Sequence, residues 1–260
     1  REDRSYDFGV AYRDETTDIS RSRNFQFAAS RSEKRWHGFT RTIGLKYYTG
    51  DFEIGQDEEE LEFGNTRLLF AEGTLSRRRM NDRLAPRRGY QFNFGLRLGS
   101  DAVVSNTDLA QTWVRGTWLL PQGDRNRFKL RGELGAMSVG NFDALPPDLR
   151  FFAGGDRSIR GFDYQNIGEV NSNGLIVGGE YLAVVSGEYE YYFTEDWGAA
   201  VFVDMGDAFT ERFSLNVGTG VGARWKSPLG PIRIGVGFPV KTDLPLETGW
   251  RLHVLLGPDL

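Results

Sequence analysis

Histidine is the side chain best suited to acid–base chemistry near neutral pH, and the chain has two, His37 and His253. They lie far apart in the sequence, and no G-x-S-x-G word supplies a serine nucleophile for either. The Ser186-Gly187 pair is typical of ordinary strand packing. Cysteine is absent, and histidines and carboxylates do not recur at the spacing of metal ligands. The sequence therefore predicts no catalytic residue, no metal site and no cofactor.

One arginine stands out instead, in a long segment that lacks a strand pattern. The segment from Gly140 to Gly178 has few alternating residues and is far longer than an ordinary hairpin loop. It contains the run DLRFFAGGDRSIRGFDY (148–164), with Arg160-Gly161-Phe162 near its end. A planar guanidinium can hold two carboxylates at once, and glycine allows a tight backbone turn. The alternative interpretation is that Arg160 is a solvated loop charge.

Composition limits the elements that could position such a residue. Of 260 residues, 39% are hydrophobic and 13% aromatic, and the longest apolar stretches are much shorter than the roughly 18 residues of a spanning helix. Any membrane crossing must therefore use strands. The mean hydropathy of −0.45 suits strands with one wet face. A net charge of −4, with both signs interspersed, gives no indication of nucleic-acid binding.

Apolar residues alternate with small or charged residues along much of the chain, as in strands of a membrane barrel. From Leu215 to Trp225, the odd positions are mostly apolar and the even positions are mostly Gly, with Asn216 and Arg224. Similar alternation runs through 90–98, 128–134, 197–205 and 232–238. We expect the apolar set to face lipid and the other set, charged or very small, to face a lumen.

This pattern predicts an all-β fold, a transmembrane antiparallel β-barrel of twelve strands. The strands are expected near 5–14, 22–33, 37–52, 65–78, 88–101, 108–120, 126–139, 179–194, 197–209, 213–227, 230–241 and 248–258. An even number lets the first and last strands pair and close the sheet. The faces of 37–52 and 65–78 stay ambiguous because Arg41 and Glu72 fall on or near the apolar side.

Connections are expected to differ at the two ends of the barrel. Tight turns at Pro121–Asn126, Thr194–Asp196 and Ser227–Gly230 are predicted on the periplasmic side. The acidic stretch Gln56–Glu60 is predicted to be a solvated external loop without chemistry.

The Arg-Gly-Phe motif at 160–162 lies in a run that resembles a known protein family. The run 148–164 resembles the large external loop of the superfamily of outer-membrane assembly barrels that contains BamA, TamA and the two-partner secretion transporters. Its wording is most similar to TamA, the barrel subunit of the translocation and assembly module. Other matching words are VSGEY (185–189), VFVDMG (201–206), GTGVGARW (218–225), SPLGP (227–231) and GPDL (257–260).

The resemblance implies a loop-lock motif. In the family, the motif arginine reaches into the lumen and pairs with acidic groups on the barrel wall. The matching residues of this chain are Arg160, Gly161, Phe162, Glu188, Asp204 and Gly206. Strand alternation independently assigns Glu188 and Asp204 to the inward face.

The resemblance also implies a function and a location. Family barrels lie in the bacterial outer membrane, in contact with its lipid, and insert client strands at a weak seam between first and last strands. TamA-type barrels serve autotransporter and other β-barrel clients with a periplasm-spanning TamB-like partner. The seam residues here would be Trp250, Leu252, Val254 and Leu256.

The resemblance further bears on domain organisation. Family barrels have sixteen strands preceded by POTRA domains, so residues 1–260 would be one barrel domain whose POTRA domains and first strands are absent from this chain. The terminal Leu260 departs from the aromatic residue common at this position.

Three alternatives stay open from the sequence. A passive pore could be lined by Arg97, Arg131, Arg224 and Arg233. The chain could also be the barrel anchor of a patatin-type secreted lipase, or a barrel hydrolase that uses Ser and His. The RGF word with two matching wall acids favours an assembly barrel over a pore.

Overall fold

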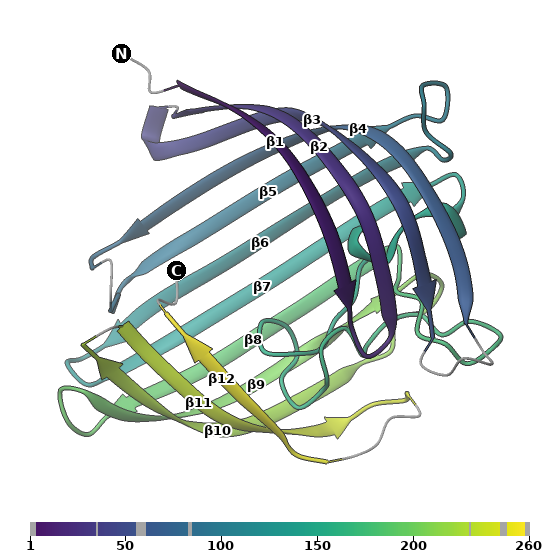
Figure 1. Ribbon diagram of the computed structural model, residues 1–260. Helices are drawn as coiled ribbons and strands as arrows, with labels where there is room; N and C mark the ends of the chain where they lie inside the picture. Colours follow the sequence, from purple (N-terminus) through teal and green to yellow (C-terminus); the bar gives the residue numbers. More distant parts are fainter. Residues whose placement is uncertain are drawn as a thin grey trace.

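The computed structural model describes residues 4–34, 36–55, 61–82, 85–228, 230–244 and 249–257. They form one antiparallel sheet in which each strand pairs with its neighbours in sequence, from β1 to β12 (Figure 1). The strands are β1 (Arg4–Thr16), β2 (Ser20–Lys34), β3 (Phe39–Ile54), β4 (Glu62–Met80), β5 (Gly89–Gly99), β6 (Leu109–Gln122), β7 (Asn126–Val139), β8 (Tyr181–Tyr192), β9 (Trp197–Phe209), β10 (Asn216–Ser227), β11 (Gly230–Lys241) and β12 (Arg251–Leu256). The predicted all-β fold of twelve antiparallel strands is confirmed.

Helical structure is limited to short 3₁₀ turns. In the described ranges these are η1 (Trp36–Gly38), η2 (Phe142–Ala144) and η3 (Pro147–Leu149). No helix among the described residues is long and apolar enough to cross a membrane. The acidic stretch 56–60, predicted to be an external loop, lies outside the described residues.

The sheet curls strongly, but its two edges do not meet. β1 pairs only with β2, and β12 pairs only with β11, within the described strands. The even strand count led us to expect closure, yet Figure 1 shows the first and last strands apart. The described strands thus form an open, curled sheet and not a closed barrel.

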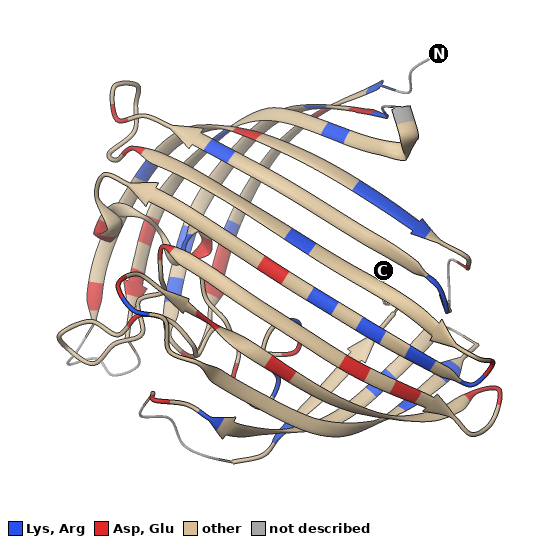
Figure 2. Ribbon diagram, turned by 180° about the vertical axis from the view of Figure 1, so that it is seen from behind, with Lys and Arg blue, Asp and Glu red and all other residues tan. Residues whose placement is uncertain are grey.

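Alternation sorts the side chains onto two faces, which we call the inner (concave) and outer (convex) faces. Outer residues Val201, Val221 and Val254 are exposed, whereas Asn216 and Arg224 on the inner face are buried. The predicted faces of β9, β10 and β12 are therefore correct. Figure 2 shows charged residues along the strands as well as at the turns.

The two ambiguous strands also take definite faces. On β4, Glu72 shares the inner face with buried Leu68 and Phe70, and its carboxylate accepts from Lys46 Nζ at 2.7 Å and Arg97 Nε at 2.6 Å. On β3, Arg41 lies on the outer face and pairs with Glu33.

The inner face is not uniformly charged or small, contrary to expectation. Tyr48, Leu68, Phe70, Leu109 and Met137 are buried on it. They pack against apolar residues of the segment between β7 and β8, which folds back into the concave side of the sheet (Figure 1). The segment's contribution to this cluster is Leu145, Leu149, Phe151, Ala153, Ile159, Phe162 and Ile167. The curled sheet thus encloses an apolar core where the sequence suggested only a wet lumen.

Candidate functional site: the arginine between β7 and β8

Four side chains of β8 and β9 form one patch on the inner face. The register pairs Ser186 with Asp204 and Glu188 with Phe202, so the two acids are diagonal neighbours. All four side chains are at most 5% exposed. The sheet therefore presents two carboxylates, a hydroxyl and an aromatic ring over a small area.

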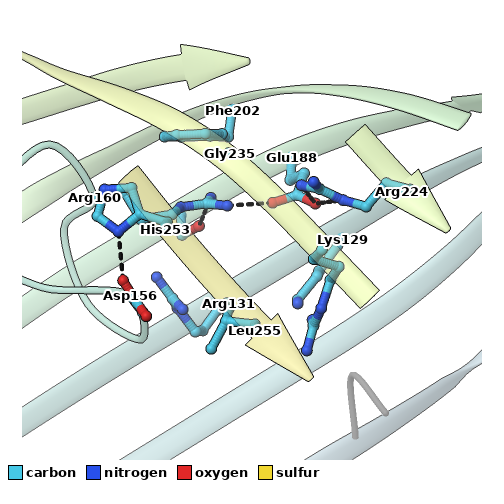
Figure 3. Close-up of a pocket in the computed structure, with 12 residues that line it drawn as sticks. Lys129, Arg131, Asp156, Arg160, Glu188, Phe202, Arg224, Gly235, His253 and Leu255 are labelled. Atoms are coloured by element: carbon cyan, nitrogen blue, oxygen red, sulfur yellow. Dashed lines mark hydrogen bonds and ion pairs between the residues drawn. The ribbon is translucent and has the colours of Figure 1, made fainter. Parts of the chain in front are cut away.

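Arg160, from the segment between β7 and β8, contacts all four members of this patch. Its Nε and Nη2 donate to Asp204 at 2.7 and 2.9 Å, and its Nη1 donates to Glu188. Nη2 also donates to Ser186 Oγ at 3.4 Å, while the guanidinium lies 3.6 Å from the centroid of the Phe202 ring. Figure 3 shows the Arg160–Glu188 contact beside Phe202. One planar cation holds both acids, as its fork geometry allows.

The charge of this arginine is stabilised by the patch. Burial alone would lower the pKa of Arg160, but its hydrogen bonds to Asp204 and the negative charges of Asp204 and Glu188 outweigh burial. The net effect raises the pKa of Arg160 above its ordinary value. The residue therefore stays charged although only 7% of it is exposed.

A chain of alternating charges extends from this contact across the wall. Arg224 on β10 donates from Nε to Glu188 at 3.0 Å and lies 3.4 Å from Glu190. Arg127 on β7 donates to Glu190 at 2.9 Å. Glu188 and Glu190 are thus each shared by two arginines, which offsets the cost of removing their charges from water.

Glycines let the backbone of the motif approach the wall. Gly161 has φ +97°, and a Cβ there would lie 2.7 Å from the carbonyl carbon of Phe238 on β11. On β10, a Cβ at Gly218 would overlap the carbonyl oxygen of Arg160. Strand alternation predicts small residues on the inner face of β10, and the close approach of the Arg160 carbonyl supplies the reason at Gly218.

The other two residues of the expected motif lie on either side of this contact. Phe162 is 4% exposed and belongs to the apolar cluster between the segment and the sheet. Gly206 follows Asp204 on the inner side of β9, at φ +154°, where a Cβ would overlap the carbonyl oxygen of Ala183.

The last strand also holds this segment, through residues that sequence reasoning missed. His253 on β12 is buried, and its Nε2 accepts a hydrogen bond from Gly161 N–H at 3.0 Å. Its other nitrogen, Nδ1, contacts the carboxylate of Asp156 (Figure 3). An accepting Nε2 requires the proton to be on Nδ1, which then donates to Asp156.

A second contact lies one inward position earlier on β12. Arg251 donates to Asp163 through Nε at 2.6 Å and Nη2 at 2.8 Å. The sequence feature that could have predicted these contacts was the polar inner face of β12, formed by Arg251 and His253. Their acidic partners could not be identified because Asp156 and Asp163 lie in a segment without periodicity.

The residues predicted to form a seam lie on the opposite face of β12. Leu252, Val254 and Leu256 are exposed on the outer face, and Trp250 precedes the strand. They do not contact Arg160. The structure thus separates an outer apolar row from the inner polar row that holds the segment.

All four arginines considered as pore lining contact protein groups, and Arg233 donates to the carbonyl oxygen of Gly257 at 3.3 Å. Arg97 pairs with Glu72, Arg224 pairs with Glu188, and Arg131 donates to the carbonyl oxygen of Ser158. A cavity of about 680 Å³ remains beside the segment, lined in part by Arg131 and Arg233. Within the part of the chain that the structure describes, no three His, Cys, Asp or Glu residues cluster as metal ligands would.

Comparison with known proteins gives a consistent result. A family model described as "Omp85 superfamily domain" matches residues 1–257. The outer membrane protein assembly factor BamA of Nitratidesulfovibrio vulgaris is 34% identical over 105 residues, which are 37% of this chain and 13% of that protein.

Solved structures agree in fold. BamA from Haemophilus ducreyi, in a form lacking POTRA domains 1–3, matches with a TM-score of 0.75 at 15% identity. That match covers 97% of this chain and 59% of the other. CdiB from Escherichia coli gives a TM-score of 0.60 at 11% identity, covering 96% of this chain and 48% of that one. The chain thus spans about half of these barrel proteins.

Proposed function

This chain belongs to the Omp85 superfamily, and on that premise we propose that it is the barrel of an outer-membrane protein assembly factor. The family and the barrel fold place it in the bacterial outer membrane. Its work would be to help client β-barrels insert or translocate at a seam next to β12, with residues 1–260 acting as one barrel domain.

The observation that carries this proposal is the double attachment of the segment between β7 and β8. Arg160 fixes the segment to the wall at Glu188 and Asp204, and His253 and Arg251 fix it to β12. A seam that opens must move β12 while the rest of the wall stays in place. We propose that this loop lock, formed by Arg160, Gly161, Phe162, Glu188, Asp204 and Gly206, holds β12 in position until a client strand arrives.

Finer assignments within the family are also proposals. The words around 148–164 support a TamA-type member serving autotransporter clients with a TamB-like partner. The outer row Trp250, Leu252, Val254 and Leu256 would be the lipid-facing side of the seam strand. The proposed activity is non-enzymatic, because strand insertion needs positioned backbone donors and acceptors rather than a nucleophile.

Reconstitution of the full-length protein tests the proposal. The protein is placed in lipid vesicles, and an unfolded autotransporter barrel is added from urea. Insertion is measured as resistance of the client to heat denaturation in detergent. We expect faster client insertion than into empty vesicles, with loss of the acceleration when a disulfide joins β12 to its neighbour β11.

The same vesicles distinguish the other candidate functions. A passive pore would release a trapped small solute without accelerating client insertion. A lipase anchor would do neither. Equal insertion rates with and without the protein would reject the assembly function.

A further inference from the structure

The outer face carries a basic site where β4 ends and β5 begins. We propose that this site binds the phosphate of an anionic phospholipid at the membrane surface. The site is formed by Arg79, Arg88, Tyr90, Trp118 and Leu120, which line a cavity of about 550 Å³. The proposal rests on the outer-membrane location of the chain and not on its assembly activity.

Strand register puts the central residues of the site at one level of the wall. Arg79 on β4 is paired with Tyr90 on β5, which is paired with Trp118 on β6. All three share the parity of outward residues, since Trp118 is 42% exposed and Leu120, two positions on, is 47% exposed. A cation and two amphipathic rings therefore lie side by side on the lipid-facing surface.

The level corresponds to the edge of the apolar band. Between the outward residues Arg67 and Arg77 of β4, the outward positions are Leu69, Ala71, Gly73 and Leu75. Ten residue steps at about 3.3 Å, tilted by about 45°, give about 23 Å of height, close to the roughly 25 Å apolar band of such barrels. Arg79 lies just beyond this band, where lipid phosphates are found. Tyr and Trp are enriched at the same depth.

Two arginines of this site lack a counter-charge among the residues that the structure describes. Arg79 and Arg88 form no side-chain hydrogen bond or ion pair with any residue in the described ranges. Outward arginines on β2 and β3 differ, because Arg31 and Arg41 both contact Glu33. The guanidinium groups of Arg79 and Arg88 are therefore available to an external anion. The adjacent Arg77 completes the site, with its guanidinium 5.5 Å from the Tyr90 ring. Figure 2 shows the basic residues at this end of β4.

A phospholipid fits these features better than a free anion does. The cavity combines two guanidinium groups with Tyr90, Trp118 and the apolar side chain of Leu120. Guanidinium binds phosphate oxygens in a bidentate manner, while the rings and the leucine contact the glycerol and upper acyl chains. Inorganic phosphate would use only the charged half of the site.

Native mass spectrometry of the folded protein, released from nanodiscs of phosphatidylethanolamine and phosphatidylglycerol, tests the inference. We expect the wild type to retain phosphatidylglycerol preferentially. Arg79→Gln and Arg88→Gln should each lower this retention roughly fivefold, the effect of one basic residue near a charged membrane surface. The control, Arg67→Gln, removes an outward charge from the other end of β4 and should retain phosphatidylglycerol as the wild type does. Heat-modifiable migration in gels verifies that each variant is folded.

Two outcomes would overturn the inference. Equal retention in all variants, or an equal loss in Arg67→Gln, would show that attraction is not localised at this site. Complete displacement of the lipid by inorganic phosphate would show a free-phosphate site in place of a lipid site. The result of this lipid-binding experiment does not decide whether the protein accelerates client insertion. A failure of the lipid inference can therefore be distinguished from a failure of the assembly function.

Discussion

The carboxylate of Asp204 accepts two hydrogen bonds from the guanidinium of Arg160, at 2.7 and 2.9 Å, and a third from the backbone N–H of the same residue, at 3.0 Å. Asp204 therefore fixes the backbone of the segment between β7 and β8 as well as its side chain. This carboxylate is fully buried on β9. The attachment sets the position of the whole motif on the wall.

Removal of the cation should destabilise the barrel strongly. Arg160→Ala leaves Asp204 buried without its charge partner and should lower the free energy of unfolding by about 3–5 kcal/mol. Arg160→Lys should recover part of this loss, because an ammonium cannot span two carboxylates in the same geometry. Urea titration of the protein in lipid vesicles measures both. A change within about 0.5 kcal/mol for Arg160→Ala, typical of an exposed site, would contradict the assignment.

At Gly161, the lack of space for a Cβ atom should impair folding more than the positive φ angle does. Gly161→Ala adds a Cβ at 2.7 Å from the carbonyl carbon of Phe238 and is expected to prevent seating of the motif. Gly174→Ala is the matched control, since Gly174 also has positive φ (+82°) but has nothing within 4 Å of an added Cβ. We expect only the first variant to lose the folded form resistant to heat in detergent. Equal yields of the folded form would refute the close approach of motif and wall.

The imidazole of His253 should protect the Gly161 amide. His253→Phe keeps a ring at this position but leaves the buried Gly161 N–H without an acceptor, at a cost of about 1–3 kcal/mol. Hydrogen exchange of this amide, followed by NMR, should accelerate about 5- to 150-fold, since 1.4 kcal/mol corresponds to a factor of about ten. The exposed His37, changed to Phe, serves as control and should leave the Gly161 amide unaffected.

The ion pair between Arg251 and Asp163 should contribute modestly and in a salt-dependent manner. Both side chains are about one-third exposed, so Arg251→Asp should cost on the order of 1 kcal/mol in unfolding free energy. Combining it with Asp163→Arg should restore most of the loss, and high salt should remove the difference. If the combined variant loses as much unfolding free energy as the two single variants lose together, this ion pair does not hold β12.

Much of the fold could be predicted from the sequence because strand alternation has a period of two. The predicted ends of β7, β9 and β11 are the observed ones, and those of the other nine strands lie within three residues of the observed ends. The same parity put Glu188 and Asp204 on the inner face, so both could be considered partners of Arg160.

The apolar inner cluster could not be predicted. On β4, Leu68 and Phe70 alternate with Leu69 and Leu75, so hydrophobicity did not distinguish the faces. Their packing partner, the segment between β7 and β8, has no periodicity and lies far along the chain. His253 and Arg251 were missed for the same reason, since their partners Asp156 and Asp163 belong to that segment.

The segment between β7 and β8 lies inside the curled sheet and is held there by Arg160. Hydrogen–deuterium exchange of the protein in nanodiscs, followed by mass spectrometry, tests this placement most directly through peptides covering 148–164. In the wild type these peptides should exchange slowly. In Arg160→Ala they should exchange roughly 10²- to 10³-fold faster, while β8 and β9 stay protected, because only the local attachment is lost. Rapid exchange of 148–164 in the wild type, or unchanged exchange in the variant, would show that Arg160 does not hold this segment inside the sheet.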